Sequence, residues 1–356
     1  MARQDFPVCR FVLQCWMTQI SLVLPFALPP PELAPDLVRA LQAPALAALI
    51  SRTASHQQLP VDEDLRALPH EAWLARALAL SADGKPAFAA AVMAGYGLAP
   101  AQGTWFIVNP AHTQIARSHM LMADMRRLQL SEAHGRILFD IAKPYFDENG
   151  MTLLYGDAGT WFMRADDWAD LETSTPDSAV GMNLTDWMPK GPPARAFRKL
   201  QNEVQMLWFE HPVNTEREAR GQAAINSFWP WGAAAAGARV DTSALATSAA
   251  SPWMAAMAGH PQATPVTPID TMSGDAILVC DALTEAAMAT DWAGWLQHMH
   301  HLEQSTFVPA LAALKDGRLQ QLQLILSHRT SQIAFTTTRF SQRAFWRRPT
   351  LDRLLP

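Results

Sequence analysis

Side chains able to bind a polar or anionic ligand are concentrated in residues 202–232, NEVQMLWFEHPVNTEREARGQAAINSFWPWG, where an apolar helical run gives way to a polar segment. Imidazole and amide groups donate and accept hydrogen bonds, and a guanidinium carries a fixed positive charge. The candidate ligand-binding residues of this kind are His211, Asn214, Arg217 and Asn226. If they line a pocket, replacing the arginine by alanine should abolish anion binding with little loss of stability.

Two tryptophans close the same segment, Trp229 and Trp231 on either side of Pro230. Such rigid rings could form an apolar wall of the pocket. Tryptophan in any domain is mostly buried, so a helix end followed by a well-packed strand is an equally good interpretation. The segment thus leaves open a ligand site and a purely structural role.

His112 is a further candidate because it follows the predicted strand TWFIVNP. Proteins of the α/β class bind ligands at strand ends, and imidazole changes charge near neutral pH. No carboxylate partner for His112 is identifiable in the sequence, so a structural role remains the alternative.

Motifs of established metal and nucleophile chemistry are missing from the sequence. It contains no HExxH, no GxSxG and no P-loop. His298, His300 and His301 share a predicted helix, but none of them are four residues apart, the spacing that makes a chelating pair. We therefore predict no catalytic residue, no metal ligand and no cofactor.

Composition indicates a globular chain larger than one usual domain. The 356 residues are 49% hydrophobic and 17% charged. A net charge of -5 argues against nucleic acid as a partner, which would need a concentrated basic surface. The one basic cluster, residues 339–348, is predicted to be a solvated tail, although its aromatic residues could also stack on bases.

Cysteine usage and hydropathy favour a cytoplasmic protein. Cys9, Cys15 and Cys280 are widely separated and form no CxxC pair, which fits a reducing compartment. No apolar run approaches the roughly 20 residues that span a bilayer, so no membrane partner is expected. Residues 1–16 are predicted to be a loose extension, with Met17 a possible start.

The elements that would position these residues alternate between strand and helix. A buried strand is predicted over residues 20–28, followed by a helix that Pro44 interrupts. Short aromatic strands around one helix, residues 131–150, predict a lobe of different character, and the α/β pattern then resumes. The predicted organisation is an α/β core over residues 17–100 and 215–340, an inserted α+β lobe over 101–214 and a basic tail over 341–356.

The stretch HPVNTEREARGQAAINSFWPWG resembles the archaeal-type cofactor-independent phosphoglycerate mutases of the alkaline phosphatase superfamily. In that family HPVN-x-x-R is followed by a glycine and a WPWG-like stretch. The segments LVLPFALPP, TWFIVNPAH, NEVQMLW and NSFWPWG also resemble bacterial RpfE-type regulatory proteins, described as phosphoglycerate mutase-like. The resemblance covers most of residues 17–335. It implies an alkaline-phosphatase-like core, with a mainly parallel sheet flanked by helices and interrupted by a lobe.

The same resemblance implies that the two-metal site of the active mutases is lost. Where they carry Asp-Gly after the first strand, this chain has Pro25 and Phe26. Residues 284–288, TEAAM, replace a D-E-A-x-H ligand motif, and Ser327 and His328 replace a late Asp-His pair. Two nearby divalent ions need several anionic oxygens and imidazoles, which these side chains do not supply.

Three functions are compatible with the sequence. The first is a catalytically degenerate mutase-like protein that binds a small anionic ligand or a protein partner in regulation. The alternative is an active mutase or phosphatase with displaced metal ligands, which would require Mn or Mg. The third is a protein-interaction module, for which 13 tryptophans and 16 methionines could supply contact surface. The oligomeric state is left open.

Overall fold

A computed structural model of the chain describes residues 18–62, 64–100, 102–116, 119–237, 240–261, 267–272 and 274–356. The predicted extension over residues 1–16 and the possible start at Met17 lie outside this part of the chain. Within it, no helix is long and apolar enough to cross a membrane.

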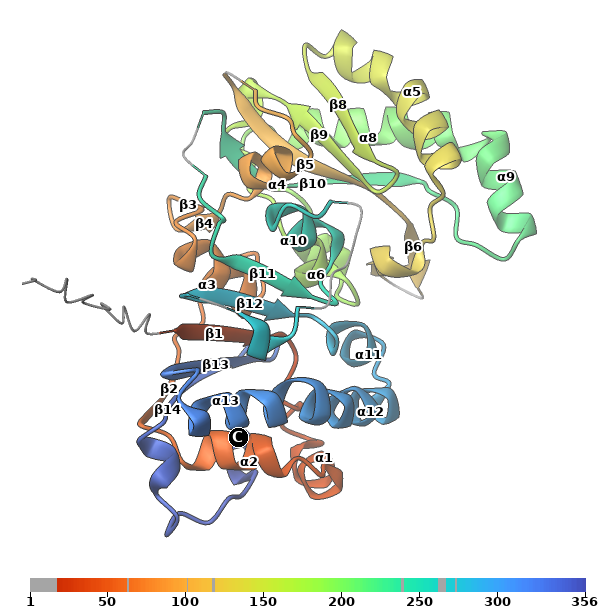
Figure 1. Cartoon of the computed structure of the whole chain (residues 1–356). Coiled ribbons are helices and arrows are strands. Elements are labelled where there is room, and N and C mark those ends of the chain that lie inside the picture. The colour runs from red at the N-terminus through yellow and green to blue at the C-terminus, as the bar shows by residue number, and fades with distance from the viewer. Residues whose placement is uncertain are drawn as a thin grey trace, which may run out of the picture.

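The central element is a six-stranded sheet (Figure 1). Its strands in spatial order are β11 (Leu245–Ser248), β12 (Ala276–Cys280), β1 (Gln19–Leu24), β13 (Gln321–Ser327), β14 (Gln332–Thr338) and β2 (Ser55–Gln58). The first four run parallel, whereas β14 is antiparallel to β13 and β2 is antiparallel to β14. This mainly parallel sheet confirms the predicted α/β class.

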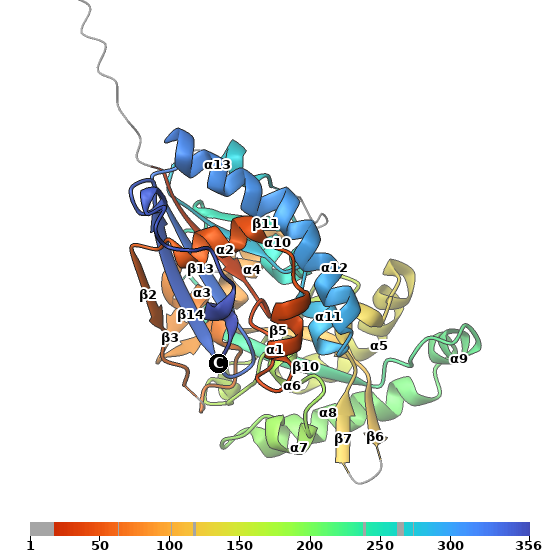
Figure 2. The same cartoon turned by 90° about the horizontal axis from the view of Figure 1, so that it is seen from below.

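Helices cover both faces of this sheet (Figures 1 and 2). On one face lie α1 (Ala34–Ala40), α2 (Pro44–Ser51), α11 (Thr284–Met288), α12 (Trp292–Leu302) and α13 (Val308–Asp316). On the other lie α3 (Pro69–Ala77), α4 (Ala89–Gly95) and α10 (Pro252–Met257). Leu22 of β1 packs in the core of the first face and Val23 in the core of the second. The continuous apolar run of β1 reflects this burial on both sides.

Pro44 interrupts the first helical segment as predicted, because α1 ends at Ala40 and α2 begins at the proline. The N-terminus of α2 is capped by a residue that is distant in the sequence. Glu303, in the π-helical turn Glu303–Phe307 between α12 and α13, accepts hydrogen bonds from the backbone N–H groups of Ala45 and Leu46 at 2.6 and 3.1 Å. A buried carboxylate at a helix N-terminus offsets its unpaired N–H groups and locks α2 against the long helix.

The lobe is built on a four-stranded antiparallel sheet. Its strands in spatial order are β10 (Ser227–Ala235), β5 (Thr104–Ala111), β9 (Thr160–Arg164) and β8 (Thr152–Asp157). The covering helices are α5 (Glu132–Glu148), α8 (Ala194–Phe209) and α9 (Pro212–Ala219). The sequence boundary placed at residue 214 falls inside α9, and β10 beyond it pairs with β5. The sheet of the lobe thus extends to Ala235.

The described residues also form a number of short elements. They are β3 (Ser81–Ala82), β4 (Lys85–Pro86), β6 (Thr113–Ala116), β7 (His119–Met122), η1 (Met125–Arg127), η2 (Asp166–Trp168), α6 (Pro176–Ala179), α7 (Leu184–Trp187), η3 (Ile269–Thr271), η5 (Ser341–Arg343) and η6 (Asp352–Leu354).

Residues 341–356 belong to the core rather than to a free tail. Gln342 is buried and its amide donates to the carbonyl of Ala48, and Arg353 donates to the carbonyl of Ile50. Leu354 is part of the core beside α2. These contacts with the C-terminal end of α2 give the segment partners that its polar composition did not indicate.

Core and lobe meet through α4 and α10, which lie between the two sheets (Figure 1). Phe88, Trp231 and Trp253 form an aromatic cluster there, with ring centroids 4.8 to 6.3 Å apart. The helices approach closely because Gly95 has no side chain. A Cβ at this position would lie 1.9 Å from the carbonyl oxygen of Ala256.

Gly95→Ala should therefore lower the free energy of unfolding by about 3 kcal/mol, since backbone atoms of α10 must shift to admit the methyl group. Gly159→Ala is the matched control, because the nearest atom to its Cβ would be 3.9 Å away. We expect the control to stay within about 0.5 kcal/mol of the unmodified protein in urea unfolding. Equal stability of the two variants would contradict the close helix contact.

Candidate functional site

Polar side chains meet at the carboxyl ends of β1, β12 and β13, the edge at which open α/β sheets bind ligands. Asp281 follows β12, and Ser327 ends β13. His70 and Glu71, from the first turn of α3, complete the cluster on the second face. These four residues and Asp177 of α6 are buried. We call this group, His70, Glu71, Asp177, Asp281 and Ser327, the strand-end cluster.

Phe26 occupies the centre of this edge. Its ring lies edge-on to the imidazoles of His70 and His328, with centroids 6.2 and 6.1 Å away. Its backbone has a φ of 56°, a left-handed conformation that is unusual for a bulky residue. The Nε1 of Trp295 donates to the Phe26 carbonyl at 2.8 Å and so holds this turn. The phenyl ring therefore packs against both imidazoles.

Arg126 supplies a positive charge from the η1 turn, which lies between β7 and α5 of the lobe. Its guanidinium lies 2.9 Å from Asp177 and 3.0 Å from Asp124. Although burial lowers the pKa of Arg126, the two carboxylates raise it above the ordinary value. Its third nitrogen lies 2.8 Å from the sulfur of Met288 in α11. One side chain thus links the lobe, α6 and α11.

A second guanidinium, that of Arg329, lies 6.0 Å from the centre of the Phe26 ring. It donates to the backbone carbonyls of Asp177, Ser178 and Val180 at 2.8 to 3.5 Å. Both arginines near the strand-end cluster are therefore already bonded to protein oxygens.

The remaining carboxyl groups are buried beside Asp177. Burial and the charge of Asp177 raise the pKa of Glu71 to about 8. Its carboxylate accepts from the N–H of Leu68 at 2.7 Å and the hydroxyl of Thr175 at 2.6 Å. Burial likewise raises the pKa of Asp281 to about 7, and Thr284 donates to it. Both groups can therefore hold a proton near neutral pH.

The imidazoles are held in the neutral form. Burial lowers the pKa of His70 to about 4 and also lowers the pKa of His328. His70 Nδ1 lies 3.4 Å from the hydroxyl of Ser327. Neutral imidazoles are potential metal ligands, but the apolar ring of Phe26 packs against both of these.

These residues do not fit a pair of divalent ions. Two such ions need several ionised carboxylates, whereas Asp177 is paired with Arg126 and Asp281 has a raised pKa. The part of the chain that the structure describes contains no group of three or more His, Cys, Asp or Glu arranged to hold a metal. Met288 ends the TEAAM stretch, and its sulfur contacts a guanidinium.

The residues predicted to bind a ligand from the HPVN stretch lie elsewhere, in the lobe. The Nδ1 of His211 accepts from the N–H of Val213 and caps the start of α9. Asn214 is buried, and its side chain bonds the N–H and the carbonyl of Ile225 at 2.8 Å each. Arg217 is 0% exposed, and its guanidinium donates to backbone carbonyls. The acceptors are Leu128, Gln129 and Ala223.

The other predicted ligand residues also bond to protein atoms. The side-chain amide of Asn226 both donates to and accepts from the backbone of Thr113 at 2.8 Å. The ring of His112 lies 2.7 Å from the carbonyl of Ala224. The indoles of Trp229 and Trp231 are buried and donate to Ser174 and Asn109. The structure thus brings four of the predicted residues together at one turn, residues 223–226: Asn214, Arg217 and His112 clamp its backbone, and Asn226 belongs to it.

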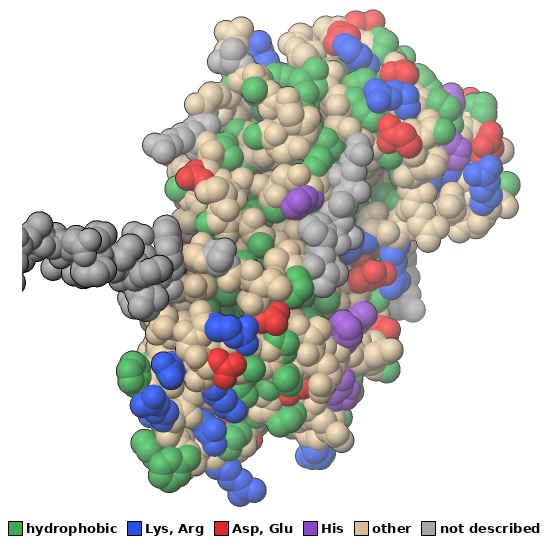
Figure 3. Space-filling view, in the orientation of Figure 1, with side chains coloured by type: hydrophobic (Ala, Val, Ile, Leu, Met, Phe, Trp, Pro, Cys, Tyr) green, Lys and Arg blue, Asp and Glu red, His purple; other side chains and the backbone are tan. Residues whose placement is uncertain are grey.

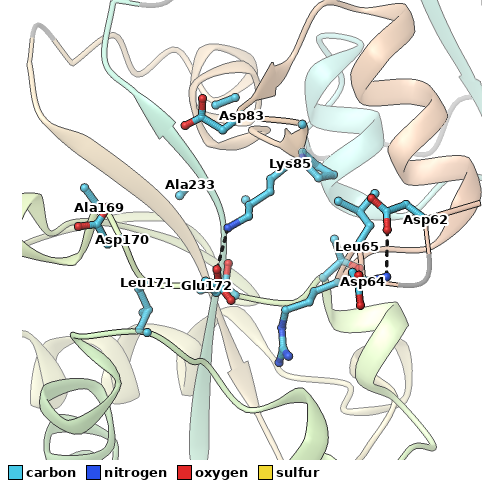
Figure 4. Close-up of a pocket in the computed structure, with 18 of the residues that line it drawn as sticks. Asp62, Asp64, Leu65, Asp83, Lys85, Ala169, Asp170, Leu171, Glu172 and Ala233 are labelled. Carbon is cyan, nitrogen blue, oxygen red and sulfur yellow. Dashed lines mark hydrogen bonds and ion pairs between the residues drawn. The ribbon is translucent and has the colours of Figure 1, made fainter.

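A cleft of about 700 Å³ lies between core and lobe (Figure 4). Lys85 reaches across it to Glu172, with 3.2 Å between nitrogen and oxygen. Its charged lining residues are Asp62, Asp64, Arg66, Asp83, Lys85, Asp170 and Glu172. Five of these seven are acidic, so the cleft favours a cationic group over an anion. Sequence reasoning missed the cleft because its walls come from segments far apart in the chain.

Comparisons with known proteins leave the family of this chain open. No protein-family profile matches it, and no curated protein matches it. Among solved structures, it is similar to a cofactor-independent phosphoglycerate mutase from Thermoplasma acidophilum, with 15% identity, 90% of this chain and 89% of the other covered, and a TM-score of 0.43. It is also similar to the PH0037 protein from Pyrococcus horikoshii, with 12% identity, 90% and 87% covered, and a TM-score of 0.47.

Arg217→Ala should lower the free energy of unfolding by about 3 kcal/mol, because three carbonyls lose their donor. The sequence alone had predicted that the same variant would stay stable and lose anion binding, and the buried contacts of Arg217 replace that prediction. Arg220→Ala in the same helix region is the control, since that arginine is exposed, and should change stability by less than about 0.5 kcal/mol. Chemical denaturation measures both, and a stable Arg217→Ala protein would argue against the clamp.

Asp281→Asn should change how stability depends on pH. The pKa of Asp281 is raised from 3.8 to about 7, so its contribution to stability is fully present below pH 3.8 and is lost as pH rises through about 7. Asparagine keeps the acceptor for Thr284 but does not titrate. Relative to the unmodified protein, the variant should gain on the order of 2 kcal/mol between pH 5 and pH 8. Parallel stability curves for the two proteins would refute the raised pKa.

Proposed function

We propose that this chain is a phosphoglycerate mutase-like protein that lacks the two-metal chemistry of the active mutases and works by binding. The observation that carries the proposal is Phe26, whose ring lies just after the end of β1 and packs against both His70 and His328. A nucleophile or metal at this edge would need the space and the charge that the phenyl ring excludes.

The charges around Phe26 support the same proposal. Arg126 is engaged by Asp177 and Asp124, and Arg329 by backbone carbonyls. Transfer of a phosphoryl group is stabilised by cations directed at the reacting oxygens. Arginines whose charges or donors are already engaged by protein groups are poorly placed for this role. The regulatory role implied by the resemblance to RpfE-type proteins is compatible with such a site.

We place the small-molecule ligand in the cleft between core and lobe. Its volume of about 700 Å³ is within the range of small-molecule sites. The excess of acidic side chains there favours a ligand bearing an amine or guanidinium group. The anionic ligand expected from the sequence depended on Arg217, which is buried and bonded to carbonyls.

Purified protein should show no conversion of 3-phosphoglycerate to 2-phosphoglycerate in a coupled assay, with added Mn²⁺ or with a chelator. The melting temperature should also be unchanged by Mn²⁺, because a protein without a metal site gains no stability from the ion. A protein with such a site would be stabilised by about 2.7 kcal/mol at a metal concentration of 100 times the dissociation constant. An archaeal-type mutase assayed in parallel controls for the coupling enzymes.

Turnover that the chelator abolishes would overturn the proposal and establish an active mutase with displaced metal ligands. Turnover that is insensitive to the chelator would also overturn it and indicate metal-independent catalysis. Absence of turnover together with a melting temperature raised by a polyamine would support binding in the cleft.

A further inference from the structure

A basic and aromatic surface lies at the end of the molecule away from the lobe. It is formed by residues 339–348, RFSQRAFWRR, which we call the aromatic knuckle. Phe340, Phe345 and Trp346 are 74%, 82% and 72% exposed. Figure 3 shows hydrophobic and basic side chains gathered over this end, where the dark blue C-terminal segment of Figure 1 lies. Three large apolar rings exposed so close together mark an interaction surface.

The charge of the knuckle differs from that of the whole chain. It contains Arg339, Arg343, Arg347 and Arg348 and no acidic residue, and no Asp or Glu occurs anywhere in residues 317–351. The net charge of the protein is nevertheless -5. Positive charge is therefore concentrated beside the exposed rings, and the surface is complementary to a negatively charged partner.

The knuckle is held in place by the core. The buried side chain of Gln342 donates to Thr337 at 2.7 Å and to the carbonyls of Ala48 and Arg52. The hydroxyl of Ser341 accepts from the N–H of Thr338 at 2.9 Å. The backbone between the exposed rings is thus fixed, so that binding requires little further ordering of the chain.

The arrangement of the rings favours a lipid surface over nucleic acid. Phe345 and Trp346 meet edge to face at 81°, which does not provide the parallel platform on which bases stack. The guanidinium of Arg343 lies over the ring of Phe340, and Arg347 donates to the carbonyl of Thr53. Apolar rings surrounded by arginines match a bilayer interface, where rings enter the headgroup layer and guanidinium groups bind phosphate oxygens.

We propose that the aromatic knuckle docks this protein on the surface of a membrane that contains anionic lipids. Phe345 and Trp346 enter the interfacial layer, while Arg343 and Arg348 lie at the level of the phosphates. Each arginine near an anionic surface strengthens binding about fivefold, so that the four together give strong dependence on lipid charge and on salt. The contact is peripheral and independent of the strand-end cluster, and it replaces the sequence expectation that no membrane is involved.

Sedimentation of the full chain with vesicles tests the proposal. We expect binding to vesicles of phosphatidylcholine mixed with phosphatidylglycerol, weaker binding at high salt, and little binding to phosphatidylcholine alone. Phe345→Ser combined with Trp346→Ser should lower the partition coefficient at least about tenfold. Arg343→Glu combined with Arg348→Glu should lower it by a similar factor.

The matched control is Met206→Ser combined with Phe209→Ser on α8, which removes two side chains that are 74% and 70% exposed in the lobe. This control should bind vesicles like the unmodified protein, and circular dichroism should show that all variants are folded. Equal loss in the control, or no preference of the unmodified protein for anionic vesicles, would overturn the proposal. Binding of a single-stranded oligonucleotide through the knuckle in the absence of vesicle binding would replace it with nucleic-acid recognition.

Discussion

The ion pair between Arg126 and Asp177 is the interaction on which the strand-end cluster depends. Asp177 is buried with Glu71 and Asp281 nearby, and an uncompensated carboxylate at such a position destabilises a protein by about 3 to 5 kcal/mol. Arg126 supplies the compensating charge, and it belongs to the turn that precedes α5 of the lobe. Arg126 therefore couples the burial of these carboxylates to the position of the lobe on the core.

The turn after β1 lies beside the same cluster. Phe26 has a left-handed backbone, which costs on the order of 1 kcal/mol, and a mainly apolar environment offsets this cost. Trp295 fixes its carbonyl, and Arg329 lies beside the ring. Strain at a strand end often indicates a functional site, but here the strained residue fills the space itself. The strain is thus better explained by packing than by catalysis.

Much of the architecture could be predicted from local patterns, because β1 is apolar on both faces and Pro44 cannot continue a helix. The extent of the lobe could not be predicted. Proline in β10 argues against a central strand, and Pro230 is tolerated because β10 is an edge strand, a fact that only the pairing with β5 reveals. Burial of polar side chains could not be predicted either, because the residue type alone does not distinguish a buried arginine from an exposed one.

The HPVN to WPWG stretch shows why a resemblance in sequence can report architecture rather than chemistry. Its polar side chains look like ligands when the backbone is ignored, but Asn214 and Arg217 bond to main-chain atoms of the turn before β10. That turn places Trp229 and Trp231 at the junction of lobe and core, where their indoles donate to Ser174 and Asn109. The polar side chains of this stretch thus bond to protein atoms of the lobe and of its junction with the core. These contacts explain the stretch by packing, and the proposed function depends instead on the side chains around Phe26.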